Sequence, residues 1–191
     1  MPDQFKQHIA KFVPITEAEF TGICTYFNQE LLQKKEQVLS EGQTCKKKYF
    51  VLSGCMRMFF INEKGAEQTT QFAIEQWWLA DLFSFIRQQP SSFAIQALEK
   101  TEVLSITATA YAQLLNDFPF METYFRQVYQ ITAAAAQMRV KFLYGYSKEE
   151  LYLQFSSNFP EFVQRVPQYL LANYLGCTPE YISEIRAKRR S

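Results

Sequence analysis

The sequence predicts an α+β protein in which helices flank a compact antiparallel β-roll. Within residues 36–106, short apolar runs alternate with turn residues, which is typical of a small roll or barrel. On both sides of this region, apolar residues recur at the spacing of amphipathic helices. At the end of the chain, residues 166–190 combine proline, glycine and threonine in an order that predicts two short helices joined by a tight turn.

The composition is that of a folded chain. The 191 residues are 48% apolar and 20% charged, enough for a packed core in one large domain or in a medium and a small one. The net charge is +1, so any attraction to nucleic acid must be local. The chain lacks an apolar run of about 18 residues and a secretion signal, so we expect no membrane contact and no export.

Histidine and cysteine usage argues against common catalytic and metal sites. A catalytic triad or histidine-rich metal site would depend on the only histidine, His8, so a surface or internally hydrogen-bonded side chain is the simpler interpretation. The cysteines match no zinc or iron–sulfur spacing: Cys24, Cys45, Cys55 and Cys177. We therefore expect reduced thiols, a cytoplasmic location, and no catalytic residue, metal or cofactor. An unknown small-molecule effector stays open.

Helices and strand pairs follow in order. An apolar stripe over residues 5–12 ends at Pro14, and Thr16 with Glu19 forms a capping box for a second helix. In the roll, a hairpin is predicted to join residues 56–61 to 67–74, and a second strand pair to join 93–98 to 102–106, with a short helix between the pairs. Thr107 can cap the helix that follows the roll.

A long helix beginning near Pro119 carries one apolar stripe. Its members are three or four residues apart: Phe120, Tyr124, Val128, Ile131, Ala135, Met138 and Phe142. The stripe can pack along the chain's own roll, or it can form a seam between two copies. We favour the seam, because the helix is long relative to the roll and the alanines at 133–136 permit close approach.

The last segment predicts a helix-turn-helix after a capping box at Ser147 and Glu150. Gly176 is placed to end the first helix in the left-handed conformation, and Thr178 with Pro179 to begin the second. Residues expected to face inward are Leu171, Ala172, Leu175, Ile182 and Ile185. The alternative is a helical corner without a role in DNA binding. It is disfavoured by the polar outer face and by the positive local charge of +2 over residues 161–191. Because this charge is small, we expect few phosphate contacts per subunit.

The chain resembles the cyclic-AMP receptor protein and fumarate–nitrate regulator (Crp/Fnr) family of bacterial transcription factors, in particular its short Bacteroidetes-type members. The resemblance covers nearly the whole chain and depends on the order of the matching pieces: residues 34–42, 49–57, the hairpin turn at 63–65, residues 78–82, the long helix and residues 166–180.

The resemblance implies three parts. They are a cyclic-nucleotide-binding-like β-roll (a double-stranded β-helix) with N-terminal helices at 1–117, a dimerisation helix at 118–145, and a helix-turn-helix DNA-binding domain at 146–191. It implies a homodimer on double-stranded DNA, with RNA polymerase as a further candidate partner. The residues expected to face DNA are Gln168, Thr178, Pro179, Glu180, Tyr181, Ser183, Glu184, Arg186, Lys188, Arg189 and Arg190.

The family's ligand site is altered here. Nucleotide-binding members hold the ribose with the glutamate of a Gly-Glu-Leu segment and the cyclic phosphate with an arginine, where this chain has Ala80-Asp81-Leu82 and Ser91. Loss of the charge-assisted pair costs on the order of 1.5–3 kcal/mol, so we expect cyclic AMP to bind poorly or not at all. Arg87 is a weak substitute. The residues expected around an effector pocket are Trp78, Ala80, Asp81, Leu82, Ser91 and Ser92.

Two features of this region have simpler interpretations. Asp81 can cap the short helix that follows it. The aromatic residues Trp77, Trp78, Phe83 and Phe85 either line an apolar effector pocket or belong to the core.

Three functions compete. The favoured one is a homodimeric, sequence-specific DNA-binding transcription regulator with a sensory roll, in which Glu180 matches a family glutamate that accepts a hydrogen bond from cytosine. The second is a sensing or interaction protein of the same fold that has lost DNA binding, because Glu184 stands where the family commonly has arginine. The third is a cupin-type enzyme, which needs histidine ligands that the predicted roll lacks, so we predict no enzyme.

Overall fold

A computed structural model describes residues 3–188 and divides the chain into two compact units, Met1–Tyr129 and Gln130–Ser191. The first unit contains α1 (Asp3–Ala10), α2 (Glu17–Cys24), β1 (Asn28–Leu32), β2 (Gln37–Leu39), β3 (Lys47–Ser53), β4 (Met56–Ile61), β5 (Glu67–Ala73), β6 (Trp78–Leu79), α3 (Leu82–Arg87), β7 (Ala94–Ala97), β8 (Thr101–Thr107) and α4 (Ala108–Asp117). Helix α5 (Phe120–Gly145) begins in the first unit and ends in the second. The second unit continues with α6 (Lys148–Asn158), α7 (Pro160–Arg165), α8 (Gln168–Leu175) and α9 (Pro179–Lys188).

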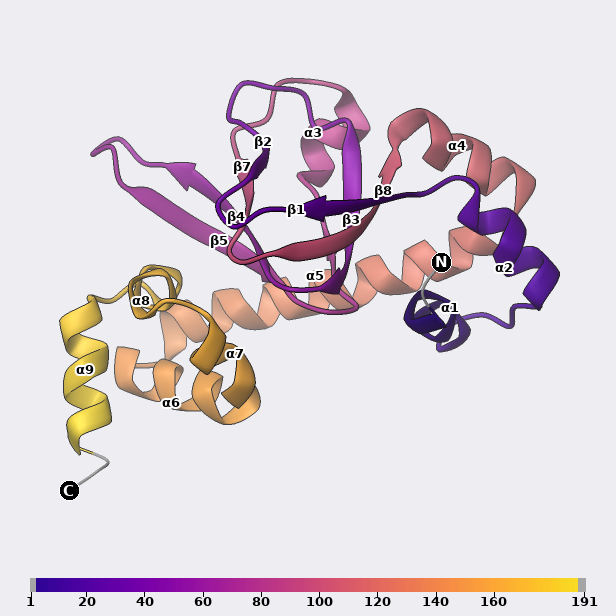
Figure 1. The fold of residues 1–191 in the computed structure, drawn as a ribbon. Coiled ribbons are helices and arrows are strands. Elements are labelled where there is room, and N and C mark those ends of the chain that lie inside the picture. Colours follow the sequence, from indigo (N-terminus) through magenta and orange to yellow (C-terminus); the bar gives the residue numbers. More distant parts are fainter. Residues whose placement is uncertain (1–2, 189–191) are drawn as a thin grey trace. The chain divides into compact units, whose positions relative to one another are not determined.

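Two antiparallel sheets form the roll and confirm the predicted α+β class (Figure 1). The strand order is β1-β8-β3-β6 in one sheet and β2-β7-β4-β5 in the other. The predicted hairpin is confirmed, because β4 and β5 pair from Met56 opposite Ala73 to Ile61 opposite Glu67. The short helix expected after this hairpin is α3.

The predicted second strand pair is wrong. β7 pairs with β2 and β4, whereas β8 pairs with β1 and β3, so these consecutive strands lie in different sheets. The chain crosses between sheets after β7, where the Leu98 N–H donates to the carbonyl oxygen of Cys55. Apolar alternation identifies a strand but not its partner, so a crossover and a hairpin look alike in sequence. The roll also begins earlier than residue 36, at Asn28 of β1.

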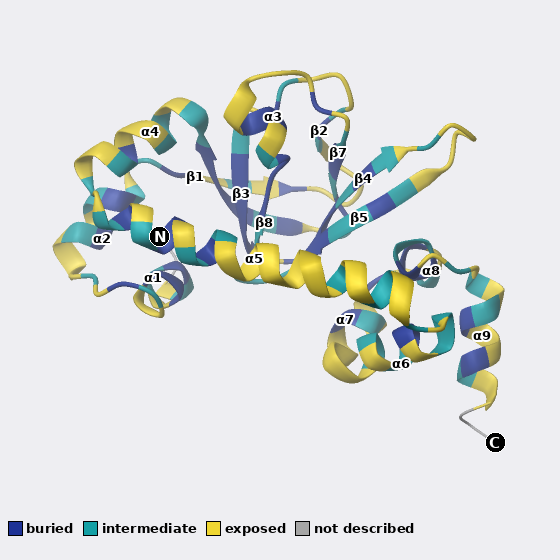
Figure 2. Ribbon diagram, turned by 180° about the vertical axis from the view of Figure 1, so that it is seen from behind, coloured by how far each residue is buried: buried dark blue, intermediate teal, exposed yellow. Residues whose placement is uncertain are grey.

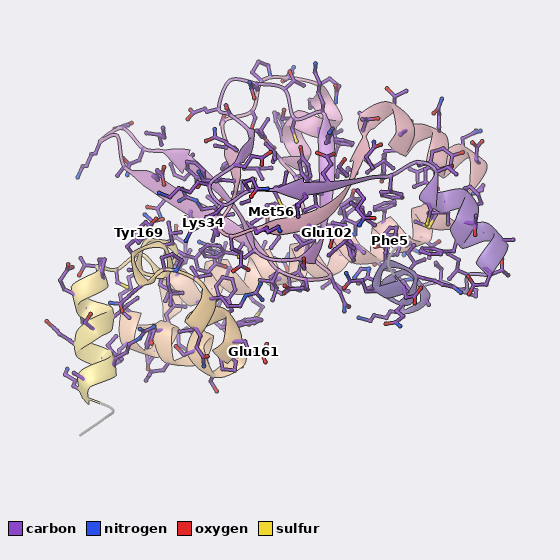
Figure 3. The ribbon with its side chains drawn as sticks, viewed as in Figure 1. Phe5, Lys34, Met56, Glu102, Glu161 and Tyr169 are labelled. Atoms are coloured by element: carbon purple, nitrogen blue, oxygen red, sulfur yellow. The ribbon has the colours of Figure 1, made fainter. Side chains whose placement is uncertain are left out.

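Alternating side chains of β3 separate two hydrophobic cores. Tyr49 and Val51 pack inside the roll with Met56, whereas Phe50 packs on the outer face with the flanking helices. The outer core is rich in aromatic rings; those of Phe5 and Phe50 have centroids 4.9 Å apart. Figure 3 shows Met56 within the roll and Phe5 on α1. Burial of each large apolar side chain contributes about 1.5–3 kcal/mol.

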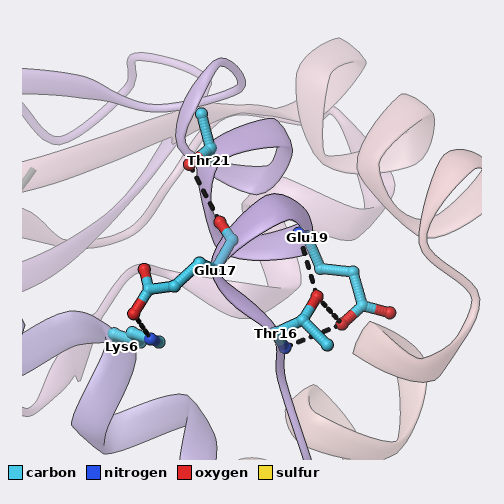
Figure 4. A network of polar contacts seen from close by, with 5 residues as sticks. All are labelled: Lys6, Thr16, Glu17, Glu19 and Thr21. Atoms are coloured by element: carbon cyan, nitrogen blue, oxygen red, sulfur yellow. Dashed lines mark hydrogen bonds and ion pairs between the residues drawn. The ribbon is translucent and has the colours of Figure 1, made fainter.

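The predicted helix caps are confirmed. Thr16 Oγ1 accepts the Glu19 N–H at 3.3 Å, and the Glu19 carboxylate accepts the Thr16 N–H at 2.8 Å (Figure 4). Ser147 and Glu150 make the same reciprocal pair at the start of α6, and Thr107 caps α4. Each cap pairs amides that the helix itself leaves without partners and contributes about 1 kcal/mol.

Helix α5 has a buried part and an exposed part (Figure 2). Tyr124 and Val128 are buried in the outer core, so the packing interpretation is confirmed for the first part of the stripe. Every residue from 131 to 138 is exposed, and the exposed fractions of Ile131 and Met138 are 57% and 44%. For this second part, a seam between two copies stays a prediction.

The second unit has a core of its own. Its buried members are Leu151, Tyr152, Leu171, Ala172, Leu175, Ile182 and Ile185, and Phe142 and Leu143 of α5 pack against them. Helix α7 was not predicted, because six residues with Pro160 in the first turn leave no apolar period to detect. Among the helices within residues 3–188, none is long and apolar enough to cross a membrane.

Candidate functional site

The turn between α8 and α9 has the conformation that the sequence predicts. Gly176 ends α8 with φ at 69°, and the Cys177 N–H donates to the carbonyl oxygen of Ala172 at 2.9 Å. Thr178 Oγ1 then accepts the Tyr181 N–H at 3.2 Å and caps α9. Most residue types are strained at this φ, so glycine suits the position.

Two isoleucines hold α9 against the rest of the second unit. Ile182 and Ile185 are 0% and 1% exposed and belong to one core cluster with Ala172, which is 0% exposed. A larger side chain at Ala172 would overpack this contact, typically at a cost of about 1–3 kcal/mol. One face of α9 is thereby buried and the other is open.

The open face of α9 carries most of the residues assigned to DNA. The exposed ones are Thr178, Glu180, Ser183, Glu184 and Lys188. Pro179 and Tyr181 are half-buried, and Arg189 and Arg190 lie outside the described residues. The exposed side chains between 178 and 188 thus include two carboxylates and one ammonium group.

Two further residues assigned to DNA make contacts inside the second unit. Arg186 Nε donates to the Tyr152 hydroxyl at 2.7 Å, and a terminal guanidinium nitrogen donates to Gln168 Oε1 at 3.1 Å. Gln168 Nε2 donates to the Pro179 carbonyl at 2.6 Å and to Ser183 Oγ at 2.7 Å. We call Tyr152, Gln168, Ser183 and Arg186 the Arg186 network. It connects α6, α8 and α9.

A hollow of about 900 Å³ lies beside the Arg186 network. Its lining residues come from α6 to α9: Tyr152, Ser156, Pro160, Val163, Gln164, Arg165, Val166, Pro167, Gln168 and Arg186. The lining contains two arginines and no carboxylate, so its chemistry suits an anion.

In the first unit, the altered ligand residues bind one another. Asp81 is 5% exposed and accepts the Ser84 N–H at 3.1 Å, which confirms its capping role at α3. Its other carboxylate oxygen accepts the Ser91 hydroxyl at 2.6 Å, and Ser91 is 3% exposed. We call Asp81, Ser84 and Ser91 the Asp81 network. The two positions that the resemblance connects with a nucleotide thus satisfy each other.

Backbone groups around Ser91 are also paired. The Ser91 N–H donates to the Gln43 carbonyl at 2.9 Å, and the Ser91 carbonyl accepts the Gly42 N–H at 2.8 Å. The Cys45 N–H donates to Ser84 Oγ at 2.8 Å. Open backbone amides are common ligands of phosphate groups, and these three amides already have partners.

The other expected pocket residues face different surroundings. Ala80 is buried in the roll core, and Leu82 packs against that core. Ser92 is exposed. Trp78 packs against the outer core instead, where its Nε1 donates to the Tyr124 hydroxyl at 2.9 Å.

The aromatic residues near α3 are likewise dispersed. Phe85 is buried in the roll core, whereas Trp77 and Phe83 are 43% and 67% exposed. Arg87, the weak substitute for the family's arginine, is exposed. These side chains do not share one apolar environment, so the sequence cluster is not a spatial cluster.

The first unit contains a buried lysine that the sequence pattern does not indicate. Lys48 is 3% exposed, and its ammonium group lies 3.5 Å from the Tyr111 ring centroid and 4.4 Å from that of Phe85. It also contacts the Tyr129 hydroxyl. Burial lowers the pKa of Lys48 to about 7. A run of three lysines is typical of a solvated segment. Lys48 lies two residues before Phe50 in the same strand, and this spacing alone indicates that both side chains face the helices.

The single histidine is internally hydrogen-bonded, as the simpler interpretation predicts. His8 Nδ1 lies 2.8 Å from the Tyr124 hydroxyl, and the His8 side chain is largely buried. Burial, with a smaller effect from the Lys11 charge, lowers the pKa of His8 to about 4. His8 is therefore neutral near pH 7.

Comparisons with known proteins agree with this architecture. Residues 29–118 match the family model of the cyclic nucleotide-binding domain. Electron transport regulator A of Shewanella oneidensis is 26% identical over 167 residues, which cover 81% of this chain and 65% of that relative. The chain thus spans just under two thirds of the relative's length.

Solved structures share the fold at low sequence identity. The catabolite activator protein of Thermus thermophilus aligns with a TM-score of 0.60 at 18% identity, over 95% of this chain and 85% of that one. A transcriptional regulator described as Crp/Fnr family, from Eubacterium rectale, aligns with a TM-score of 0.67 at 16% identity, over 90% and 82%.

These matches define first a domain class and then a fold. Residues 29–118 form a cyclic nucleotide-binding domain, and the C-terminal helices are consistent with a helix-turn-helix. The chain has the fold of the Crp/Fnr family of transcriptional regulators, which confirms the resemblance noted in the sequence.

Proposed function

We propose that the protein is a cytoplasmic, homodimeric transcription regulator that binds specific DNA sequences through α9. The observation that carries the proposal is the two-faced character of this helix. Ile182 and Ile185 hold one face against the domain core, while the opposite face offers hydrogen-bonding side chains to solvent. A helix presented in this way is suited to the major groove.

The proposed base contacts come from carboxylates. Glu180 lies exposed in the first turn of α9, where a carboxylate can accept a hydrogen bond from the amino group of cytosine. Glu184 is exposed one turn later. Both repel phosphates, so the attraction to the DNA backbone must come from exposed cations such as Lys188 and Arg165.

The proposed dimer forms along the second part of α5. Ile131, Ala135 and Met138 form an exposed apolar stripe, and the alanines at 133–136 keep the helix thin. Two copies packed along this stripe would bury it and bring two α9 helices to one duplex. Pairing also compensates for few phosphate contacts in each subunit. By family resemblance, RNA polymerase is a further candidate partner of the DNA-bound dimer.

We also propose that the roll does not bind cyclic AMP in the family's manner. A cyclic phosphate at Ser91 would lie near the buried Asp81 carboxylate rather than near a cation. The paired Ser91 and Cys45 amides give it no replacement donors. Repulsion and lost hydrogen bonds both oppose binding.

The second candidate function is a sensing or interaction protein that has lost DNA binding. The observation that favours it is the pair of exposed carboxylates on α9, Glu180 and Glu184. In that case α9 would present its acidic face to a basic protein rather than to DNA.

Selection of binding sites from a random duplex pool tests the proposal. At near-physiological salt, the purified protein is expected to enrich a pseudo-palindrome with half-sites about one helical turn apart. Enrichment of a single half-site would contradict the dimer. Absence of enrichment would contradict the DNA-binding proposal and favour the second candidate.

A further inference from the structure

Arg186 occupies an unusual place for a basic residue near the C-terminus of the chain. Its side chain is half-buried and turns toward α6 and α8, where its hydrogen-bond acceptors are the Tyr152 hydroxyl and the Gln168 amide oxygen. Tyr152 is 5% exposed, so its hydroxyl is held by a ring fixed in the core. Arg186 thus ties the last turn of α9 to two other helices.

Gln168 extends the connection to the beginning of α9. While its oxygen accepts from Arg186, its amide nitrogen donates to the Pro179 carbonyl at 2.6 Å and to Ser183 Oγ at 2.7 Å. One side chain of α8 therefore contacts the first turn, the middle and, through Arg186, the last turn of α9. These contacts lie along one edge of the helix.

The hydrogen bonds along this edge restrict the rotation of α9 about its axis, which the apolar contacts alone do not. Ile182 and Ile185 are the buried residues of α9, and two neighbouring apolar side chains permit the helix to roll by small angles. Hydrogen bonds to base edges weaken steeply with misalignment, so small rotations matter for sequence recognition. Directional bonds along the edge of α9 restrict that rotation.

We propose that Arg186 is a positioning residue for DNA recognition: it fixes the rotation of α9 through Tyr152 and Gln168. This inference rests on the proposed DNA-binding function. The planar guanidinium suits the role, because it reaches two acceptors at once, which a lysine ammonium on a flexible chain does not do in the same geometry.

Charge-conserving and charge-neutral variants separate positioning from a phosphate contact. Arg186→Lys keeps the charge but loses the two-acceptor geometry, and Tyr152→Phe removes one acceptor without changing any charge. Both are expected to lower affinity for the selected operator by about 3- to 10-fold each. Both should leave affinity for random duplex DNA and the salt dependence of binding unchanged.

Lys188→Gln is the matched control on the exposed face of the same helix. If Lys188 contacts a phosphate, its loss weakens operator and random DNA equally and reduces the salt slope by about 1. The positioning role is overturned if Arg186→Lys binds the operator like the wild type while Arg186→Ala reduces the salt slope as Lys188→Gln does.

Hydrogen exchange of the full-length protein without DNA provides an independent readout. The α9 amides are expected to exchange faster in Arg186→Lys and Tyr152→Phe, but not in Lys188→Gln. Unchanged α9 exchange in the first two variants would overturn the positioning role even if DNA binding is established. Absence of operator binding by the wild type, with faster exchange in these variants, would refute the proposed function and leave the structural network supported.

Discussion

The Asp81 network and the open face of α9 are both polar, yet they differ in what their groups are free to do. In the first, a buried carboxylate accepts two hydrogen bonds from its own unit, one of them from Ser91, which the family resemblance aligns with an arginine. On the open face of α9, Glu180, Glu184 and Lys188 are exposed, while the opposite face of the helix is buried in the core of the second unit.

This difference underlies the proposal that DNA reading is retained while the family's mode of cyclic-nucleotide binding is lost. Buried polar groups that satisfy one another stabilise a fold but offer little to a ligand, because a ligand must first break those bonds. Exposed polar groups on a fixed helix offer their hydrogen bonds to a partner at little cost. Substitutions in the Asp81 network should therefore change stability, and substitutions on α9 should change DNA binding.

The largest effect is expected from a charge placed in the proposed dimer seam. Ala135→Glu puts two charges into the proposed seam, and loss of paired half-site binding should weaken operator affinity by at least about 100-fold. Sedimentation should then detect monomers. Ala133→Glu is the matched control on the opposite face of α5. A dimer that survives Ala135→Glu but dissociates in Ala133→Glu would move the seam to that face.

The second effect concerns stability alone. Asp81→Ala leaves the Ser84 N–H without its acceptor and leaves the Ser91 hydroxyl with only the Phe93 carbonyl, at 3.0 Å, which should lower the free energy of unfolding by about 2 kcal/mol. Denaturant titration measures this change. The exposed neighbour Ser92, changed to alanine, should shift it by less than about 0.5 kcal/mol. Equal losses in the two variants would mean that the Asp81 network is not a stabilising feature.

The third effect concerns specificity alone. Glu180→Gln replaces an acceptor for cytosine with a side chain that pairs with adenine, so the preferred base should change at one position of each half-site, by about 1–3 kcal/mol. Repeating the duplex selection with the variant measures the change. The melting temperature should stay the same, because Glu180 is exposed. An unaltered operator would remove Glu180 from the base contacts.

The smallest effect is a pH dependence in the first unit. The pKa of Lys48 is lowered from 10.5 to about 7 in the folded protein, so between these values the unfolded chain binds one more proton and stability rises with pH. Below pH 7 both states are protonated and this contribution is constant. Lys48→Met should abolish the rise and stabilise the protein most at or below pH 7.

Thermal unfolding from about pH 6 to about pH 10 measures this dependence. Lys46→Met, at an exposed position in the same lysine run, is the control and should follow the wild type. A rise that persists unchanged in Lys48→Met would assign it to other groups.

Features determined by neighbouring residues could be predicted from the sequence. The capping boxes at Thr16 and Ser147 and the left-handed Gly176 each depend on a few consecutive residues, and all are present. The helical stripe of α5 was recognised, but which part of it is buried depends on where the roll ends.

Features that join distant residues could not be predicted in this way. The strands β7 and β8 are adjacent in sequence but pair in different sheets. The Arg186 contact to Tyr152 spans 34 residues. Only the folded chain brings such groups together, so their partners leave no local pattern. The Asp81 cap could be predicted because Ser84 follows three residues later, whereas the contact between Asp81 and Ser91, ten residues apart, could not.

The most direct test of the contrast between the two sites is the affinity of the purified protein for its selected operator, measured by fluorescence anisotropy with and without millimolar cyclic AMP. We expect specific binding that is the same in both conditions, because α9 is proposed to be already positioned and the Asp81 network to leave no site for the cyclic phosphate. Specific binding that appears only with cyclic AMP would contradict it.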